Sequence, residues 1–305
     1  MVAYVVAIVL LALAVVTIIR SGDGAALPSL SVHLPALAIL AGLTLVTALL
    51  SGVAFRILTV RYGHVSWLEM IALVNTAWLL NFLPLRPGLF GRVAYHKAVH
   101  GIGVRDSVRV LLWAYTLSLA GAAVVLVLGI AGASMPWLDR WLPVIAGVLV
   151  LSIAALAVWA RHVRPQPDPE VWRAIAVLGI RCVELHLWAA RYFICFELVG
   201  HPVTWSAALI FAAVSTVASL VPLSGNGLGV REWAVGGLAW LLPGVLAAGT
   251  AVTLGVGLEA DLINRAVEVL VAVPLGLASA LIVHQFSRAS LTRAGASADG
   301  PSPSP

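Results

Sequence analysis

Two short loops combine the residue types and the spacing that a phosphate-binding site needs. The first extends from Asn81 to Arg92 and the second from Ser219 to Arg231. In both loops an apolar stretch reaches a proline, and a glycine-rich turn then leads into the pattern Gly-Leu-x-x-Arg. Backbone N–H groups of such a turn form a concave anion site, and the following helix directs its positive end towards it. The arginine adds a planar, bidentate donor that suits phosphate.

The glycines and arginines of the two loops are therefore the candidate ligands of a phosphate group. Proline ends a helix, and glycine lets the backbone approach a ligand closely. The alternative interpretation is that both loops are ordinary cytoplasmic turns whose arginines follow the positive-inside rule. Under the functional interpretation, the phosphate-binding residues are Arg86, Gly88, Arg92, Gly227, Gly229 and Arg231.

A second group of polar residues lies inside apolar segments, where an ionisable side chain costs at least about 2.5 kcal/mol unless it finds a partner or water. Helical spacing places Arg181, Glu184 and Arg191 on one face, unless the first of them lies in the membrane interface. Glu232 either orients its neighbouring arginine, accepts a proton or a lipid amine, or simply favours a helix N-terminus. The predicted polar path consists of Asn81, Glu184, Arg191, Glu232 and Arg265.

Other pairs of polar residues favour structural roles. Asp261 and Arg265 are four residues apart, which supports an ion pair along one helix face. His96 and His100 have the same spacing, but no third ligand lies nearby, and we predict no metal site. The sequence shows no Ser/His/Asp or Cys/His set with useful spacing. We therefore expect neither a cofactor nor enzymatic catalysis.

The elements that position these residues are membrane helices. Of 305 residues, 61% are hydrophobic and 10% are charged, whereas soluble domains carry about 25% charged residues. In lipid only helices and closed barrels satisfy the backbone, and the long continuous apolar runs favour helices. We predict one transmembrane domain, residues 1–288, and a disordered Ser-, Ala-, Gly- and Pro-rich tail, residues 289–305. The net charge of +5 sits in short loops and does not indicate nucleic acid.

Hydropathy predicts eight or nine spans in an all-α, polytopic fold. The arginine-rich loops 85–109 and 161–173 are expected in the cytoplasm, with Arg56 and Arg61 as exceptions on the other side. The N-terminus is expected outside. The candidate spans are residues 2–19, 35–55, 67–84, 108–131, 141–160, 175–199, 204–222, 233–258 and 262–284.

The two loops occupy matching places in two possible half-repeats, residues 35–150 and 175–288. Broken or re-entrant helices at corresponding places in two halves are typical of the substrate site of a transporter. The dipeptide Pro243-Gly244 marks a further break in the last quarter of the chain.

The loops also resemble the two defining stretches of the lysylphosphatidylglycerol synthase transmembrane region, or flippase-like family. A weaker third likeness lies near the C-terminus, and the resemblance extends from about residue 35 to residue 285. The residues that carry it are Asn81-Phe82-Leu83-Pro84-Leu85-Arg86-Pro87-Gly88 with Arg92, Pro222 to Glu232, and Arg265 with Pro274 and Gly276.

This resemblance implies a role in lipid movement. The full-length synthases join the membrane region to a soluble domain that attaches lysine to phosphatidylglycerol, and the membrane region carries the product to the outer leaflet. Relatives are linked to hopanoid or polyprenyl-linked lipids. This sequence lacks the synthase domain, so we expect no aminoacylation. Family members often have an acid after the first loop's glycine where Leu89 follows Gly88 here, which puts a lysyl-lipid ligand in doubt.

We therefore expect a flippase-like transporter in the bacterial cytoplasmic membrane that moves a phospholipid or another phosphate-bearing lipid between leaflets. Its expected partners are that lipid and an enzyme of lipid modification. One alternative is an accessory subunit or enzyme for lipid-linked glycosyl transfer. Another is a scaffold that transports nothing.

Overall fold

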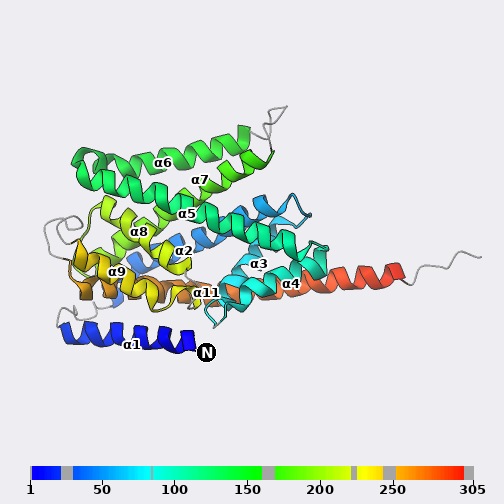
Figure 1. Cartoon of the computed structure of the whole chain (residues 1–305), viewed down its shortest axis with the longest axis horizontal. Coiled ribbons are helices and arrows are strands. Elements are labelled where there is room, and N and C mark those ends of the chain that lie inside the picture. Colours follow the sequence, from blue (N-terminus) through cyan, green and yellow to red (C-terminus); the bar gives the residue numbers. More distant parts are fainter. Residues whose placement is uncertain are drawn as a thin grey trace, which may run out of the picture.

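The computed structural model describes residues 2–21, 30–83, 85–159, 169–220, 225–242 and 252–298. Every regular element in these ranges is a helix, which confirms the predicted all-α class (Figure 1). The elements are α1 (Val2–Ser21), α2 (Leu30–Thr59), α3 (Trp67–Leu80), α4 (Pro87–His100), α5 (Val104–Ser134), α6 (Pro136–Trp159), α7 (Pro169–Leu198), α8 (Trp205–Leu220), the 3₁₀ turn η1 (Gly225–Gly227), α9 (Val230–Leu241) and α11 (Leu254–Ala298).

Three of the described helices are long and apolar enough to cross a membrane. They cover His33–Thr59, Val104–Ser134 and Leu254–Ala289, and a crossing needs about 20 apolar residues. The distribution of polarity differs from that of a soluble protein, in which charged side chains are almost never fully buried. Arg191 and Arg231 are among the largest fully buried side chains, whereas Leu270 and Leu281 on α11 face outwards.

Helices α3 and α4 form a hairpin whose tip is the first proline and glycine loop. The hydroxyl of Tyr95, near the end of α4, donates to Glu69 Oε1 on the first turn of α3 at 2.7 Å. The same oxygen lies 2.7 Å from His100 Nε2. The two ends of the hairpin are therefore held together, and α3, with 14 residues, reaches only about 21 Å. An arm of that length does not cross about 30 Å of hydrocarbon.

Helices α8 and α9 form a second hairpin, with the other glycine-rich loop at its tip. The two helices pack against each other, and the turn folds back so that Gly227 lies against Ser219 at the end of α8. The arms have 16 and 12 residues, or about 24 and 18 Å. Neither arm is long enough to cross the bilayer alone.

The two hairpins enter from opposite ends of the molecule. Their contacts with the two ends of the long helix α5 show this. Ser107, near the start of α5, lies 3.4 Å from His96 of the first hairpin. Gly132, near the end of α5, packs against Ser206 at the start of the second hairpin. Because α5 is one helix of 31 residues, about 46 Å long, these two contacts lie far apart. Figure 1 shows α3 and α4 on the right and α8 and α9 on the left.

The tips of the two hairpins meet near the middle of the molecule. The Cα of Gly225 lies so close to the first loop that an added Cβ would come within 2.7 Å of the Phe82 carbonyl oxygen. Arg86 Nη2 donates to the Ser219 carbonyl oxygen at 2.8 Å. Loops that are separated by about half the chain are thus in direct contact.

Three predicted spans differ in extent from the helices of the structure. Segments 67–84 and 204–222 contain α3 and α8, and each of these helices ends at its loop, after which the next helix packs back against it. The segment 233–258 is not one helix, since α9 ends at Leu241 and α11 begins at Leu254. The break predicted at Pro243-Gly244 lies outside the described residues.

The C-terminal boundaries also differ from expectation. Helix α11 runs without interruption through residues 258–262, where a loop between two spans was predicted. Asp261 in this stretch is accepted inside the protein because Tyr192 of α7 and Arg231 of α9 donate hydrogen bonds to it. Residues 289–298, expected to begin the disordered tail, form the last turns of α11.

The expected sidedness of Arg61 is corrected by an ion pair. Arg61, which follows α2, pairs with Glu170 at the start of α7. The sequence placed these two residues on opposite sides of the membrane. The difference arises at the first hairpin, in which α4 folds back along α3 so that the chain returns towards the end of α2.

Gly88 on α4 is expected to be intolerant of a side chain. A Cβ at this position would overlap the Ala77 carbonyl oxygen of α3. We expect Gly88→Ala to lower the free energy of unfolding by about 1–3 kcal/mol because the two arms must separate. Gly91→Ala, on the same helix with nothing within 4 Å, should instead stabilise by about 0.5–1 kcal/mol. Thermal unfolding in detergent tests this contrast, and equal effects of the two substitutions would contradict the hairpin packing.

Candidate functional site

A polar cavity of about 270 Å³ lies between the hairpin tips and helices α2, α5 and α7. Its volume is close to the lower end of the range for small-molecule pockets, about 300–1,000 Å³. Five residues of the predicted site line it: Asn81, Arg86, Arg92, Glu184 and Arg191. The other polar lining residues used below are Thr44, Thr47, Ser51, Asn75, Tyr115, Ser118, Arg181, Ser219, Asn226 and Glu268.

Arg92 is the least compensated charge in this cavity. It lies one turn after Gly88 on α4, so the glycine that permits close packing on α3 also brings the guanidinium inwards. The residue is 5% exposed, and its guanidinium carbon lies 3.8 Å from the centroid of the Phe55 ring on α2. Among the described residues it forms no ion pair with a carboxylate. A cation–π contact stabilises such a group but leaves its charge available to an anion.

Arg86 joins the two tips from a strained backbone position. It is the residue before α4 and has φ 50° and ψ 57°, and Leu85 before it has φ 65°. Left-handed conformations of non-glycine residues are unfavourable and persist where the surroundings enforce them, commonly at functional sites. Pro87 starts α4, where its missing N–H costs nothing. The side chain is 8% exposed and reaches Ser219 of the opposite hairpin.

The face of α7 that the sequence predicted is directed at the cavity. Arg181, Glu184 and Arg191 all line it. Arg181 Nη1 donates to Glu184 Oε2, and Ser51 Oγ on α2 donates to Glu184 Oε1 at 2.8 Å. Glu184 is thus already neutralised by an arginine on its own helix, one turn away.

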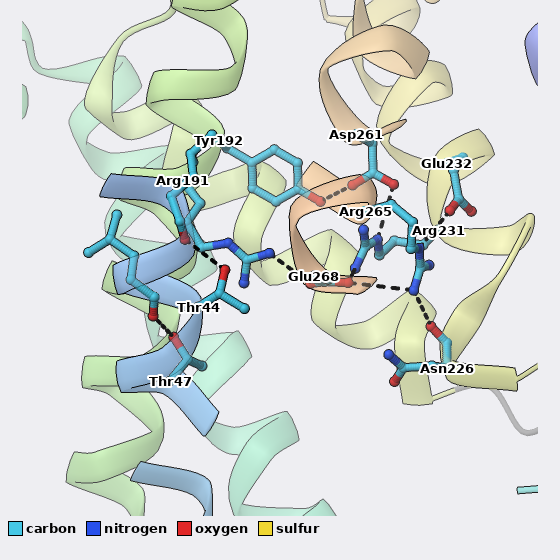
Figure 2. Close-up of polar contacts among 12 residues, drawn as sticks. Thr44, Thr47, Arg191, Tyr192, Asn226, Arg231, Glu232, Asp261, Arg265 and Glu268 are labelled. Carbon is cyan, nitrogen blue, oxygen red and sulfur yellow. Dashed lines mark hydrogen bonds and ion pairs between the residues drawn. The ribbon is translucent and has the colours of Figure 1, made fainter. Parts of the chain in front are cut away.

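A buried ion-pair network continues from the cavity into the second hairpin (Figure 2). Glu268 of α11 lies at its centre and lines the cavity. Its Oε1 accepts from Arg191 Nη2 at 2.9 Å, and its Oε2 accepts from Arg231 Nη1 at 2.8 Å. Arg231 Nε donates to Asp261 Oδ2 at 3.0 Å, and Tyr192 donates to the other oxygen of Asp261 at 2.5 Å.

The network places several predicted residues differently from expectation. Arg231, predicted to hold phosphate, is fully buried between two carboxylates and is not among the lining residues. Asp261 pairs with Arg231 across helices, instead of with Arg265 on its own helix. Glu232 accepts from Arg265 Nε at 2.9 Å. The sequence could not identify these partners because they lie 30 or more residues apart.

Gly227 and Gly229 shape the second tip without lining the cavity. They have φ 75° and 80°, which only glycine adopts readily, and Asn226 between the glycines has φ 49°. This turn directs the Asn226 carbonyl oxygen at Arg265 Nη1, 3.0 Å away. The tip is therefore fixed to α11 through its backbone.

The charges of the cavity do not balance. Its lining contains four arginines and two glutamates, and both glutamates are bound to arginines. The network behind it adds Arg231 and Arg265 against Glu232 and Asp261. Among the described residues, Arg92 is the lining arginine for which no carboxylate partner is found. A buried site with this excess attracts an anion, because burying an uncompensated charge is costly.

Sequence reasoning missed Asn75, the most buried amide of the cavity wall. It lies on α3, is 1% exposed, and neither of its amide atoms has a hydrogen-bond partner among the described residues. Buried side-chain amides are normally hydrogen-bonded. A lone asparagine inside an apolar segment was the available signal.

The histidines of α4 are part of the hairpin's base. Burial, and then the nearby Arg92 guanidinium, lower the pKa of His96 to about 4, so its imidazole is neutral at neutral pH. Burial and Glu69 raise the pKa of the Tyr95 hydroxyl above its usual value. Within the described part of the chain, no cluster of three or more His, Cys, Asp or Glu side chains could hold a metal ion.

Comparison with known proteins adds no relative: no family model, no curated protein and no solved structure matches this chain.

Proposed function

We propose that this protein is a membrane transporter that binds the phosphate of a lipid headgroup in the cavity and moves the lipid between leaflets. The observation that supports it is the buried, net-cationic cavity at the point where two opposed hairpins meet. Arg92 is the proposed phosphate ligand, because it forms no ion pair with a carboxylate among the described residues, whereas the arginines of α7 and α9 do. Arg86, which also lines the cavity and bonds to the Ser219 carbonyl oxygen, is proposed to support it. Arg231 and Arg265 are proposed to position the second tip.

Within the described ranges, the proposed topology has six crossing helices and two re-entrant hairpins, whereas the sequence predicted eight or nine spans. The crossing helices are α1, α2, α5, α6, α7 and α11. The hairpins give the two halves opposite orientations, an arrangement found in many transporters. Because about 20 residues suffice for a crossing, α1, with 20 residues, and α6, with 24, are long enough.

This topology collects basic residues at one end of the molecule. At that end α2 and α4 finish, α5 and α7 begin and the C-terminal part of α11 lies (Figure 1), and these segments contain Arg61, Lys97, Arg105, Arg109, Arg173 and Arg288. The segments at the other end, where α1 finishes and α6 begins, contain Arg20 and Arg140. By the positive-inside rule the basic end faces the cytoplasm, and we place the protein in a bacterial cytoplasmic membrane. The N-terminus then starts in the cytoplasm, the reverse of the sequence expectation.

Labelling of single cysteines tests the topology. The buried thiols Cys182 and Cys195 are first replaced by alanine. Cysteines at His64 and Lys97 should react with an impermeant maleimide from the same side, and a cysteine at Pro202 from the opposite side; all three positions are exposed. Nine uninterrupted spans would instead place His64 and Lys97 on opposite sides.

In the proposed mechanism the headgroup enters the cavity while the acyl chains stay in the surrounding lipid. The guanidinium of Arg92 receives the phosphate, and Arg86 holds the opposing tips around it. Separation of either hairpin from the other opens the cavity towards one side, so the site is reached from the two leaflets in turn. No covalent intermediate is required, because the phosphate is held only by charge and hydrogen bonds to the guanidinium of Arg92.

The experiment that tests this function is leaflet exchange of fluorescent phosphatidylglycerol in liposomes that contain the purified protein. Exchange should depend on Arg92 and should survive Arg109→Met, since Arg109 is exposed and pairs only with Asp106 of the same helix among the described residues. Absence of exchange for anionic and polyprenyl-phosphate lipids alike would reject the transporter proposal in favour of an accessory role in lipid-linked glycosyl transfer.

A further inference from the structure

We infer that the cavity selects a phosphate esterified to a neutral, hydroxyl-bearing group such as glycerol or a sugar, and that it rejects headgroups containing an ammonium. This inference rests on the proposed function and names the substrate class of the same cavity. It follows from three observations. The acids of the cavity are paired with arginines, amide groups of the first hairpin have no partner among the described residues, and hydroxyls of the cavity wall remain able to accept hydrogen bonds.

Both acids of the cavity wall are already bound to arginines. Glu184 accepts from Arg181, and Glu268 accepts from Arg191 and from Arg231 behind the wall. An ammonium group that entered would meet four lining arginines and would have to displace one of them from its carboxylate. Burying a cation without a partner is strongly unfavourable, and like charges at short range add repulsion.

The two hairpins supply neutral hydrogen-bonding groups next to the cationic ones: Asn75 and Asn81 from the first and Ser219 from the second. Neither the Oδ1 nor the Nδ2 atom of Asn75 has a partner among the described residues, and the same holds for Asn81 Oδ1 and Ser219 Oγ. All three residues line the cavity. An amide both donates and accepts, as does a hydroxyl, whereas a phosphate oxygen only accepts and an ammonium only donates. A ligand that matches an arginine next to such an amide therefore carries a phosphate, which binds the arginine, next to a hydroxyl, which bonds to the amide.

Hydroxyls elsewhere on the wall are left as acceptors. Thr44, Thr47 and Ser118 each donate to the carbonyl oxygen four residues earlier on their own helix, at 2.8 Å. Their donated hydrogens are therefore occupied, but the oxygen lone pairs remain able to accept from a ligand. A polyhydroxyl group satisfies these acceptors without bringing positive charge into the cavity.

Charge-matched lipids separate this inference from simple anion selectivity. Phosphatidylglycerol and phosphatidylserine each carry one net negative charge, but only phosphatidylserine contains an ammonium. With identical fluorescent acyl chains in proteoliposomes, we expect phosphatidylglycerol to exchange at least about tenfold faster, as for the loss of one good hydrogen-bonded contact. Equal rates for these two lipids overturn the headgroup inference and leave the transporter proposal standing.

Asn75→Leu identifies the amide that recognises the hydroxyl. It should slow phosphatidylglycerol exchange to the rate of phosphatidic acid, which has no such hydroxyl, and leave phosphatidic acid within about twofold. Asn264→Leu is the matched control, because that amide is also buried and unpartnered among the described residues but does not line the cavity. An unchanged preference in Asn75→Leu, or an equal loss in Asn264→Leu, counts against the inference.

Two further experiments distinguish a protein that does not transport lipid from one that does not recognise the headgroup. In detergent, short-chain phosphatidylglycerol should raise the unfolding temperature more than short-chain phosphatidylserine, and this readout needs no transport. Equal shifts reject the headgroup inference even where no lipid exchanges. Release of trapped glycerol 3-phosphate without lipid exchange would retain the recognised chemistry but assign it to a soluble ester, which overturns the lipid-transport proposal.

Discussion

Arg92→Met is expected to abolish lipid exchange and, at the same time, to raise the thermal stability of the protein. Methionine fills a similar apolar volume next to Phe55 without the charge. Loss of a charge-assisted contact to a buried phosphate costs about 2 kcal/mol or more, so exchange should fall by at least about 30-fold. Loss of exchange together with a gain in stability would show that Arg92 serves function and not folding.

The gain in stability follows from the environment of the guanidinium. Arg92 is buried, stacks on Phe55 and has no carboxylate partner among the described residues, and Arg181 lies 5.8 Å from the same ring. Removing an uncompensated buried charge relieves its desolvation, and replacement of buried ionic groups by apolar ones can stabilise by about 1–4 kcal/mol. Residues retained at such a cost are usually needed for function.

Thermal unfolding in detergent and leaflet exchange in liposomes measure both effects on one preparation. Arg92→Lys keeps the charge but loses the planar stacking group, so intermediate exchange is expected. Arg109→Met should change neither quantity. A destabilised Arg92→Met protein that still exchanges lipid would show that Arg92 is a structural residue.

Arg231→Met should have the opposite stability effect, because Arg231 is the shared partner of two carboxylates. Without it, Asp261 retains only the Tyr192 hydroxyl among its described partners, whereas Glu268 keeps Arg191. Breaking a buried pair by removing one side costs about 3–5 kcal/mol. We expect a poorly folding protein, seen as low yield and a reduced unfolding temperature.

A second substitution distinguishes this structural role from phosphate binding. Asp261→Asn in the Arg231→Met background removes the orphaned charge and should recover part of the lost stability, since neighbouring sites in one network are not additive. Partial recovery of folding is the expected result. If Arg231 instead bound the lipid phosphate directly, Arg231→Met would fold normally and fail only in exchange.

The two Gly-Leu-x-x-Arg loops could be recognised from the sequence because proline ends helices, glycine permits tight turns and arginine binds anions, whatever the rest of the fold. The sequence did not predict that these loops are tips of hairpins. An apolar run such as 67–84 has the hydropathy of a span, and only tertiary contacts, such as those of Gly88 with Ala77 and of Tyr95 with Glu69, show that the chain turns back. Depth in the membrane is set by tertiary packing, which hydropathy does not measure.

In the candidate site, too, the sequence predicted which residues share a helix face but not which distant residues pair with them. Spacing alone predicted that Arg181, Glu184 and Arg191 share a face, and all three line the cavity. It did not predict which acids neutralise which arginines, because Arg231 finds Asp261 and Glu268 on a helix 30 and 37 residues away. Arg92 and Arg231 occupy equivalent places in their motifs, yet only the first lines the cavity.

The meeting of the two tips also has an electrical consequence. In the proposed arrangement, each hairpin reaches part-way through the membrane, so the thin layer where Gly225 touches Phe82 separates the two aqueous faces. A transmembrane voltage falls mainly across the least conducting layer, and its field is therefore concentrated at these tips. A singly charged phosphate that passes them exchanges about 2.3 kcal/mol with the field for each 100 mV. An interior-negative cell would thus drive anionic lipid outwards through this protein without any nucleotide.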